Sequence, residues 1–546
     1  MKNWWQGAVI YQIYPRSFFD TSKNGLGDIN GITQKLSYIE DLGVDAIWLS
    51  PIFTSPMKDM GYDVSDYKDV DPLFGNLEDF KNLIRIAHSK NIKVIIDQVL
   101  SHSSDQMPFF QESKSSKNSE KADWYVWTDP KEDGSPPNNW LSVFGGSAWE
   151  WEAQRNQYYL HNFLPGQPDF NFHNQEVQNW LLDTCRFWLD LGVDGFRLDT
   201  ANYYFHDRNF RDNPPSPKKF DVPPVNPYYT QNQIYSINQI ENLQFLERFR
   251  SLLDEYSDKT SIGEIGDSHR AIEIMSEYTK NNRLHMAYSF ELLGNKFSPE
   301  HIKTTLERFF ELGDESWPCW SFSNHDVTRH VSRWGQSKNS IEFAKFTCAL
   351  LLSLRGSYCI YQGEELGQIE TELEFEELTD PPGIKFWPEN KGRDGCRTPM
   401  TWNSLEDNAG FSETKPWLPV KTPQRERSVN KQVSDKKSVL NFYKDFIAFR
   451  KSMQSLIDGE IKFHDTNDSI LSFTRIGNEK IACLFNFSNH EVKISLSDCR
   501  LINNKITQNL VIDVDKLSIG GFGFGFFHIN NKFKGFKVIN KYGNTG

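Results

Sequence analysis

Four short acidic segments each follow an apolar run of the kind that forms a buried β-strand. They are residues 97–102 (DQVLSH), 195–200 (GFRLDT), 263–267 (GEIGD) and 322–326 (FSNHD). In a barrel of parallel strands all strands end at one mouth, so carboxylates that are far apart in the sequence converge there. The recurrence therefore predicts a barrel with a cluster of carboxylates at its mouth.

Eight apolar runs bounded by turn residues alternate with amphipathic stretches. This alternation favours a parallel sheet, because each crossover between parallel strands needs a helix. The expected strands are residues 8–18, 46–53, 93–99, 195–201, 261–266, 285–291, 319–326 and 357–363. The expected helices, with apolar residues at three- and four-residue spacings, include residues 32–42, 77–91, 177–191, 241–256 and 342–354. The sequence thus predicts an α/β fold built on a (β/α)8 TIM barrel.

The 546 residues exceed the roughly 250–300 that one hydrophobic core usually serves, so more than one domain is expected. Residues 1–102 and 174–455 are assigned to the barrel. Residues 103–173 are too long for one crossover helix and are rich in Ser, Asn, Pro and Trp, which predicts an inserted subdomain after the third barrel strand. Residues 456–546 change to short alternating runs, which are typical of a small antiparallel β-sandwich domain.

The charge and hydropathy of the chain argue against nucleic acid and membrane partners. The formal net charge is −13, and Lys and Arg are scattered along the chain, so we expect no nucleic acid partner. We find no uncharged apolar stretch of about 18 residues and no signal-peptide core at the N-terminus, so we expect no membrane partner and a cytoplasmic location. The seven cysteines form no CxxC pair, which predicts free thiols in a reducing compartment.

The carboxylates at the strand ends point to a reaction. Alternate side chains of a strand share a face, so Arg197 and Asp199 are expected to point into the barrel together. A neighbouring guanidinium keeps a carboxylate ionised, as a nucleophile at a sugar anomeric carbon requires. Glu264 lies among apolar residues without a cation near it in the sequence, which would raise its pKa and keep a proton for a leaving oxygen. With Asp326 as a third acid suited to bind sugar hydroxyls, the set predicts glycoside chemistry.

Together these segments resemble the α-amylase superfamily of retaining α-glycoside hydrolases (glycoside hydrolase family 13), within it the branch of bacterial α-glucosidases and oligo-1,6-glucosidases. The resemblance runs from residue 4 to about residue 450, and the four acidic segments occur in order with companions such as QPDFN at residues 167–171. It implies that Asp199 is the nucleophile, Glu264 the acid/base and Asp326 the stabiliser of the transition state.

The resemblance also implies a pocket that holds a terminal glucose. Its expected members are Asp59, Tyr62, His102, Phe144, Phe163, Arg197, Thr200, His325 and Arg397. A pinned non-reducing end implies exo-action on small oligosaccharides such as maltose. Thr200 directly follows the nucleophile, and in similar enzymes threonine there goes with α-1,4 cleavage, whereas valine goes with α-1,6 cleavage.

No catalytic cofactor is implied, but a structural cation is. Much of the superfamily has Asn where this chain has Ser101, so the metal that α-amylases bind through that Asn is not expected. The loop at residues 20–28 resembles the calcium loop of the family's oligoglucosidases, and oxygen ligands at alternating positions suit a hard cation. The expected ligands of a structural Ca²⁺ or Mg²⁺ are Asp20, Ser22, Asn24, Asp28 and the carbonyl of Leu26.

The sequence-based hypothesis is a retaining, exo-acting α-glucosidase that hydrolyses terminal α-1,4-linked glucose from maltose and short oligosaccharides by double displacement, with transglucosylation. An oligo-1,6-glucosidase, or a sucrose-active glucosyltransferase or isomerase of the same family, stays open, because the choice between water and a sugar acceptor depends on access to the aglycone side. A non-catalytic, transporter-associated relative is an alternative of another class. It is disfavoured because such a chain would be free to lose its three acids and should carry a membrane anchor.

Overall fold

The computed structural model describes residues 3–313, 315–335, 340–465 and 469–539. Eight parallel strands form one sheet in the order β11-β10-β9-β5-β2-β1-β13-β12. A parallel bridge between Ala287 and Pro318 joins its two outer strands and closes the barrel. The strands are β1 (Val9–Ile13), β2 (Ala46–Leu49), β5 (Lys93–Gln98), β9 (Gly195–Leu198), β10 (Thr260–Ile265), β11 (Met286–Ser289), β12 (Cys319–Trp320) and β13 (Ser357–Tyr361). The predicted (β/α)8 barrel is confirmed, with shorter strands than the sequence suggested.

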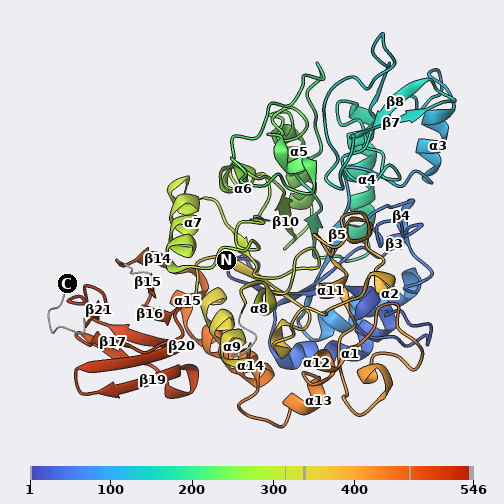
Figure 1. Ribbon diagram of the computed structural model, residues 1–546. Coiled ribbons are helices and arrows are strands. Elements are labelled where there is room, and N and C mark those ends of the chain that lie inside the picture. Colours follow the sequence, from blue (N-terminus) through green and yellow to red (C-terminus); the bar gives the residue numbers. More distant parts are fainter. Residues whose placement is uncertain (1–2, 314, 336–339, 466–468, 540–546) are drawn as a thin grey trace.

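Helices follow the barrel strands along the chain and cover the sheet from outside (Figure 1). They include α1 (Ile29–Leu42), α2 (Leu77–Ser89), α4 (Gln175–Asp190), α5 (Asn242–Asp254), α6 (Ala271–Tyr278), α7 (Pro299–Glu311), α9 (Ser340–Leu351) and α14 (Val439–Ser452). The side chains of Asp28, Asn76 and Asn174 accept hydrogen bonds from backbone N–H groups in the first turns of α1, α2 and α4, which fixes where these helices begin. Within the described ranges, no helix combines the length and apolar character needed to cross a membrane.

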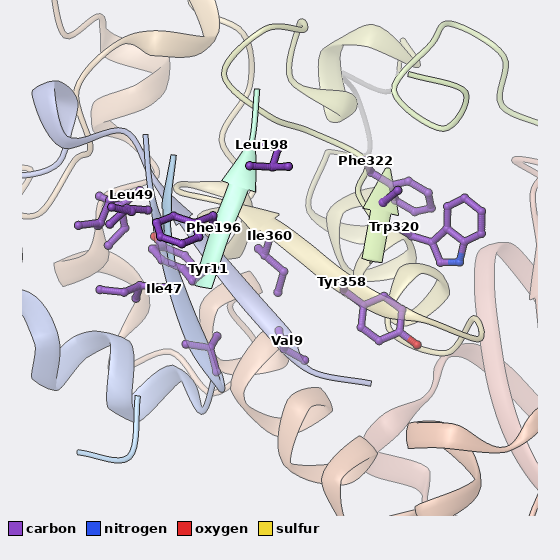
Figure 2. Close-up of a cluster of buried hydrophobic side chains, with 14 of the residues drawn as sticks. Val9, Tyr11, Ile47, Leu49, Phe196, Leu198, Trp320, Phe322, Tyr358 and Ile360 are labelled. Carbon is purple, nitrogen blue, oxygen red and sulfur yellow. The ribbon is translucent and has the colours of Figure 1, made fainter. Parts of the chain in front are cut away.

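Alternation along the barrel strands separates an apolar outer layer from a mixed interior. The outward residues pack under the helices, and Figure 2 labels Val9, Tyr11, Ile47, Leu49, Phe196, Leu198, Trp320, Phe322, Tyr358 and Ile360 in this layer. Part of the interior is filled by a second apolar cluster that includes Ile10, Trp48, Ile95, Ile262 and Cys359. At the carboxyl ends of the strands the inward side chains become polar and charged, so a rigid apolar floor supports the acidic mouth.

Besides a small pair of β3 (Phe53–Thr54) and β4 (Asp66–Val70), two antiparallel sheets flank the barrel at opposite ends of the molecule (Figure 1). The stretch after β5 contains an antiparallel sheet of β6 (Trp127–Thr128), β7 (Trp149–Glu152) and β8 (Gln157–Leu160). The C-terminal antiparallel sheet consists of β14 (Glu460–Phe463), β15 (Ile470–Ile476), β16 (Lys480–Asn486), β17 (Val492–Ser495), β18 (Cys499–Leu501), β19 (Gln508–Asp513), β20 (Lys516–Ile529) and β21 (Lys537–Val538). The exact residue limits of the three domains stay predictions.

The C-terminal sheet is buried on both faces, which ties it to the barrel. Residues such as Phe473 and Phe485 pack into the large core shared with the barrel helices, whereas Ala482 and Leu484 face a separate small core. The fully buried guanidinium of Arg475 on β15 donates hydrogen bonds to carbonyls of residues 353, 354, 456 and 459. Arg475 therefore links the sheet both to the segment before β13 and to the segment after α14.

Arg475→Met is expected to lower the free energy of unfolding by about 3 kcal/mol or more, because it leaves several buried carbonyls without a donor. Thermal and denaturant unfolding measure the change. The matched control is Arg500→Met on exposed β18 of the same sheet, which should have little effect. Equal stability of the two variants would contradict the linking role of Arg475.

Candidate active site

One buried guanidinium organises the mouth of the barrel. Arg197 on β9 has no exposed surface. Its Nη1 lies 2.7 Å from Asp97 Oδ1 and 2.7 Å from Asp199 Oδ1, and its Nη2 lies 2.6 Å from Glu264 Oε1. Because β5, β9 and β10 are adjacent strands, their inward carboxylates meet on this single cation.

Two further groups hold Glu264. The hydroxyl of Tyr288 on β11 donates to Glu264 Oε1 at 2.8 Å and accepts from Arg197 Nη2 at 2.9 Å. The backbone N–H of Thr200 donates to Glu264 Oε2 at 3.1 Å. Thr200 has φ of 41°, a left-handed conformation that a β-branched residue rarely adopts, and this turn at the end of β9 directs its N–H toward Glu264.

The buried carboxylates share too little positive charge to be fully ionised. Burial raises the pKa of Asp199 to about 7, that of Glu264 to about 7 and that of Asp97 to about 6, while Arg197 opposes the rise in all three. Glu264 has no cation near it in the sequence, but in the fold Arg197 contacts it about as closely as it contacts Asp199, and burial still raises the pKa of Glu264. Asp199 and Glu264 therefore both have pKa values raised toward neutrality, although both contact Arg197.

Asp326, after β12, has the opposite environment. It accepts from Arg397 Nη2 at 2.9 Å and lies 3.2 Å from Arg393 Nη1. Burial alone would raise the pKa of Asp326, but its neighbours, His325, Arg393 and Arg397, hold it below the ordinary value. Burial also lowers the pKa of His325, so that ring is neutral. The guanidiniums of Arg393 and Arg397 therefore hold down the pKa of Asp326. Asp326 is an ionised carboxylate.

A second cluster closes one side of the site. Arg393 Nη2 lies 2.7 Å from Asp59 Oδ1 and 2.6 Å from Asp380 Oδ1, and Gln167 Nε2 donates to Asp59 Oδ2 at 3.1 Å. Arg393 precedes the helical turn α11 (Asp394–Arg397), so it and Arg397 lie one turn apart and both reach Asp326.

A cavity of about 600 Å³ opens over these groups. Of the residues predicted from the sequence, its lining includes Asp59, Tyr62, His102, Phe144, Phe163, Asp199, Thr200, Glu264 and Asp326. Arg197, His325 and Arg397 lie behind the wall, with at most 1% of their surface exposed. They contact the lining residues from behind: Arg197 Nη1 donates to Asp199 Oδ1 at 2.7 Å, and Arg397 Nη2 donates to Asp326 Oδ1 at 2.9 Å.

The rings of the lining are held by each other and by the histidines. Tyr62 stacks on His325 with ring centroids 5.3 Å apart, and its hydroxyl donates to Asp97 Oδ2 at 3.1 Å. Phe163 packs against His102 at 5.2 Å and against Phe144 at 5.7 Å. The ring edges and faces that are left toward the cavity suit the apolar faces of a sugar.

Sequence reasoning missed Arg393 and Tyr288. Arg393 lies in the segment that carries Arg397, and its spacing of four residues before Arg397 was the available signal. Tyr288 lies two residues after Met286 on β11, so strand alternation alone places it on the inward face. Neither signal reveals which carboxylate the side chain contacts.

The loop predicted to hold a cation is closed by hydrogen bonds. Both oxygens of Asp20 accept from protein donors, among them Lys23 N at 2.7 Å and Ser412 Oγ at 2.6 Å. Asp28 accepts from Thr21 N at 2.9 Å and caps α1 through Gly31 N at 2.6 Å. Asn24 Oδ1 accepts from Leu26 N, and Ser22 Oγ donates to Asp20.

The carboxylate oxygens of this loop already accept from N–H and O–H groups, so a cation would have to compete with these contacts. In the part of the chain that the structure describes, no group of three or more His, Cys, Asp or Glu side chains is arranged to hold a metal ion. The structural Ca²⁺ or Mg²⁺ stays a prediction.

The fold and the acidic mouth define a carbohydrate-cleaving enzyme on a (β/α)8 barrel. Residues 12–459 match the family described as alpha amylase, catalytic domain. A probable alpha-glucosidase of Rhizobium meliloti (strain 1021) is 55% identical over 508 residues, which cover 92% of each chain. An oligo-1,6-glucosidase of Heyndrickxia coagulans is 37% identical over 91% of this chain and 94% of its own.

Among solved structures, the crystal structure of an alpha-glucosyl transfer enzyme, XgtA, superposes with a TM-score of 0.94 and 51% identity, covering 97% of this chain and all of that one. The chain belongs to the α-amylase family of glycoside hydrolases, in the company of α-glucosidases and oligo-1,6-glucosidases.

Because the pKa values of Asp199 and Glu264 are both raised to about 7, kcat/KM is expected to have a bell-shaped pH dependence with both limbs near neutrality. The hydrogen bond from Tyr288 lowers the pKa of Glu264, so Tyr288→Phe should raise that pKa and move the alkaline limb to higher pH. Measuring kcat/KM from pH 5 to 9 tests this. Tyr278→Phe is the matched control, because its hydroxyl contacts Asn242 on α5, outside the site, and should leave the profile unchanged. An alkaline limb that moves to lower pH would contradict the assignment.

Proposed function

We propose that this protein is a retaining, exo-acting α-glucosidase that hydrolyses terminal α-1,4-linked glucose from maltose and short oligosaccharides. Asp199 attacks the anomeric carbon, Glu264 protonates the leaving oxygen, and Glu264 then removes a proton from the water that releases glucose from the glucosyl ester of Asp199. Asp326 binds the hydroxyls of the distorted glucose ring. No cofactor takes part in these steps.

The observation that carries the proposal is that Asp199 and Glu264 bind the two terminal nitrogens of one guanidinium. One planar group can only hold carboxylates that are close together. This fits the separation of about 5 Å in retaining glycosidases and leaves less room than the roughly 6.5–9.5 Å of inverting enzymes, which must fit a water between carboxylate and sugar.

The cavity supports action at a chain end. Asp59 and Arg393 both line the cavity, and Arg393 Nη2 lies 2.7 Å from Asp59 Oδ1. This ion pair forms a wall of the cavity next to Asp326, which Arg393 also contacts. A glucose that reaches this wall has no space for a further unit on its non-reducing side. Asp59, with one oxygen on Arg393 and the other on Gln167, is oriented to accept from glucose hydroxyls.

The opposite side of the cavity is narrowed by the Pro-rich stretch at residues 214–229. Asn226, Tyr228 and Tyr229 line the cavity, and Asn226 Nδ2 donates to the carbonyl of Val143 at 2.7 Å. A mouth shaped by two loops favours short substrates over starch. The same enclosure favours a sugar that stays near the glucosyl ester as acceptor, which supports transglucosylation beside hydrolysis.

A phosphorylated disaccharide is not supported by the cavity. Two cationic side chains, Arg333 and Arg393, line it among the described residues, and both are already engaged. Arg333 donates to the carbonyls of residues 294, 322 and 328, and Arg393 contacts Asp59, Asp326 and Asp380. A phosphate on the aglycone would have to displace one of these contacts.

The first experiment follows maltose, isomaltose and sucrose separately by proton NMR, with wild type beside Asp199→Asn. We expect α-glucose to be released first from maltose, and the variant to lose activity by about 10³-fold or more, since it has no nucleophile. Release of β-glucose first would sink the mechanism, and cleavage of none of the three sugars would sink the substrate class.

Thr200→Val tests the linkage preference. The hydroxyl of Thr200 is lost while its shape is kept, and by family resemblance valine at this position goes with α-1,6 cleavage. We expect the ratio of kcat/KM for maltose to that for isomaltose to fall about tenfold. A ratio that stays constant would remove Thr200 from the linkage determinants and reopen the oligo-1,6-glucosidase alternative.

The remaining alternatives give other products. A sucrose-active glucosyltransferase or isomerase would form new disaccharides from concentrated sucrose faster than free glucose. A non-catalytic relative would release nothing from any substrate. A product profile on concentrated maltose and sucrose separates these cases.

A further inference from the structure

Ser101 contacts two residues of the site but is not among the residues that line the cavity over it. It lies just after β5, is 1% exposed, and its Oγ is 2.8 Å from His102 Nδ1 and 3.0 Å from Thr200 Oγ1. Thr200 Oγ1 is in turn 3.3 Å from Asp199 Oδ2. A line of hydroxyls therefore connects His102 to the proposed nucleophile.

The proton positions along this line follow from His102. Its Nε2 lies 3.0 Å from the carbonyl oxygen of Tyr62, which can only accept, so Nε2 carries a proton. Burial lowers the pKa of His102 to about 4, so the ring is neutral and Nδ1 has a lone pair. Gln167 Nε2, 3.1 Å from the same Nε2, directs its protons to Asp59 and to the Tyr62 carbonyl. Nδ1 therefore accepts the proton of Ser101.

With this assignment, Ser101 has one hydroxyl proton but two neighbours, His102 Nδ1 and Thr200 Oγ1. The single hydroxyl proton of Ser101 is used on His102, so Ser101 cannot donate to Thr200. The contact between the two hydroxyls then needs the proton of Thr200. That proton has Ser101 Oγ at 3.0 Å and Asp199 Oδ2 at 3.3 Å as its acceptors, and the shorter contact is to Ser101.

The competition between Ser101 and Asp199 for the proton of Thr200 affects Oδ2 of Asp199, the proposed attacking oxygen. Asp199 Oδ1 accepts from Arg197 Nη1 at 2.7 Å, whereas among the described residues Thr200 Oγ1 is the one donor near Oδ2. Oδ2 is thus the oxygen that is free to attack an anomeric carbon. A full hydrogen bond to it would stabilise its negative charge and weaken it as a nucleophile.

We propose that Ser101 is a positioning residue that draws the hydroxyl proton of Thr200 away from Asp199 Oδ2 and so keeps the attacking oxygen free. The inference rests on the proposed role of Asp199 as nucleophile. Ser101, which directly precedes His102, thus acts on the nucleophile through Thr200. It also couples linkage preference to nucleophile strength, because both depend on the Thr200 side chain.

Ser101→Ala removes the competing acceptor, so the Thr200 hydroxyl donates fully to Asp199. A hydrogen bond to the charged form lowers the pKa of Asp199, and the acid limb of kcat/KM should move to lower pH by about 0.5–1 unit, with kcat reduced about threefold to tenfold. The other charged groups that face Asp199 are Arg197, Asp97, Glu264 and Asp326, whereas the side-chain contacts of Ser101 are with His102 and Thr200. An aryl α-glucoside is the substrate, since its cleavage does not depend on the linkage between two sugars.

The double variant Ser101→Ala/Thr200→Val makes the test specific. Valine has no proton to donate, so adding Ser101→Ala to Thr200→Val should leave the acid limb unchanged, although His102 loses its donor in both Ser101 variants. Ser103→Ala is the control, because Ser103 is equally buried but contacts Tyr125 at 2.7 Å. It should match wild type.

The outcomes separate this inference from the proposed function. A shift in Ser101→Ala that disappears in the Thr200→Val background supports the positioning role. No shift, a shift to higher pH, or the same shift in both backgrounds overturns it while the enzyme remains an α-glucosidase. If wild type fails to cleave α-glucosides, the proposed function itself falls.

Discussion

The contact of one buried arginine with three carboxylates governs the active site. Arg197, with Arg393 and Arg397, faces six carboxylates: Asp59, Asp97, Asp199, Glu264, Asp326 and Asp380. Three positive charges cannot neutralise six acids, so the least compensated ones hold their protons more strongly. Burial raises the pKa values of Asp199 and Glu264, and the nearby carboxylates add to the rise that Arg197 opposes. The same excess of negative charge suits a transition state in which positive charge develops on the sugar ring.

The apolar interior of the barrel supports this charged arrangement. An apolar layer that includes Ile10, Trp48 and Ile262 fills part of the interior, and the charged layer follows on the same strands. Removal of one partner from such a buried network leaves uncompensated charge, which costs about 3–5 kcal/mol. We therefore expect the geometry of the mouth to be rigid, with adaptation left to the loops that line its outer part.

Much of this could be predicted from the sequence, because strand periodicity and acidic strand ends are local signals. Alternation placed Arg197 and Asp199 on one face and Leu198 on the other, as the structure shows. The sequence did not predict which side chains on different barrel strands contact each other. The contact of Arg197 with Glu264 joins residues 67 positions apart and depends on the register of β9 and β10. The cation loop stays a prediction for another reason, since the spacing of oxygen atoms in the sequence does not reveal which protein donors already contact them.

The central claim is that Asp199 forms a covalent bond with glucose. A fluorinated α-glucosyl fluoride, which slows release of the intermediate, should leave one glucosyl unit on the intact protein. Proteolysis and mass spectrometry should then place that unit on the peptide that contains Asp199, and Asp199→Asn should carry none. An adduct on another residue, or turnover without any adduct and with inverted product, would contradict the account.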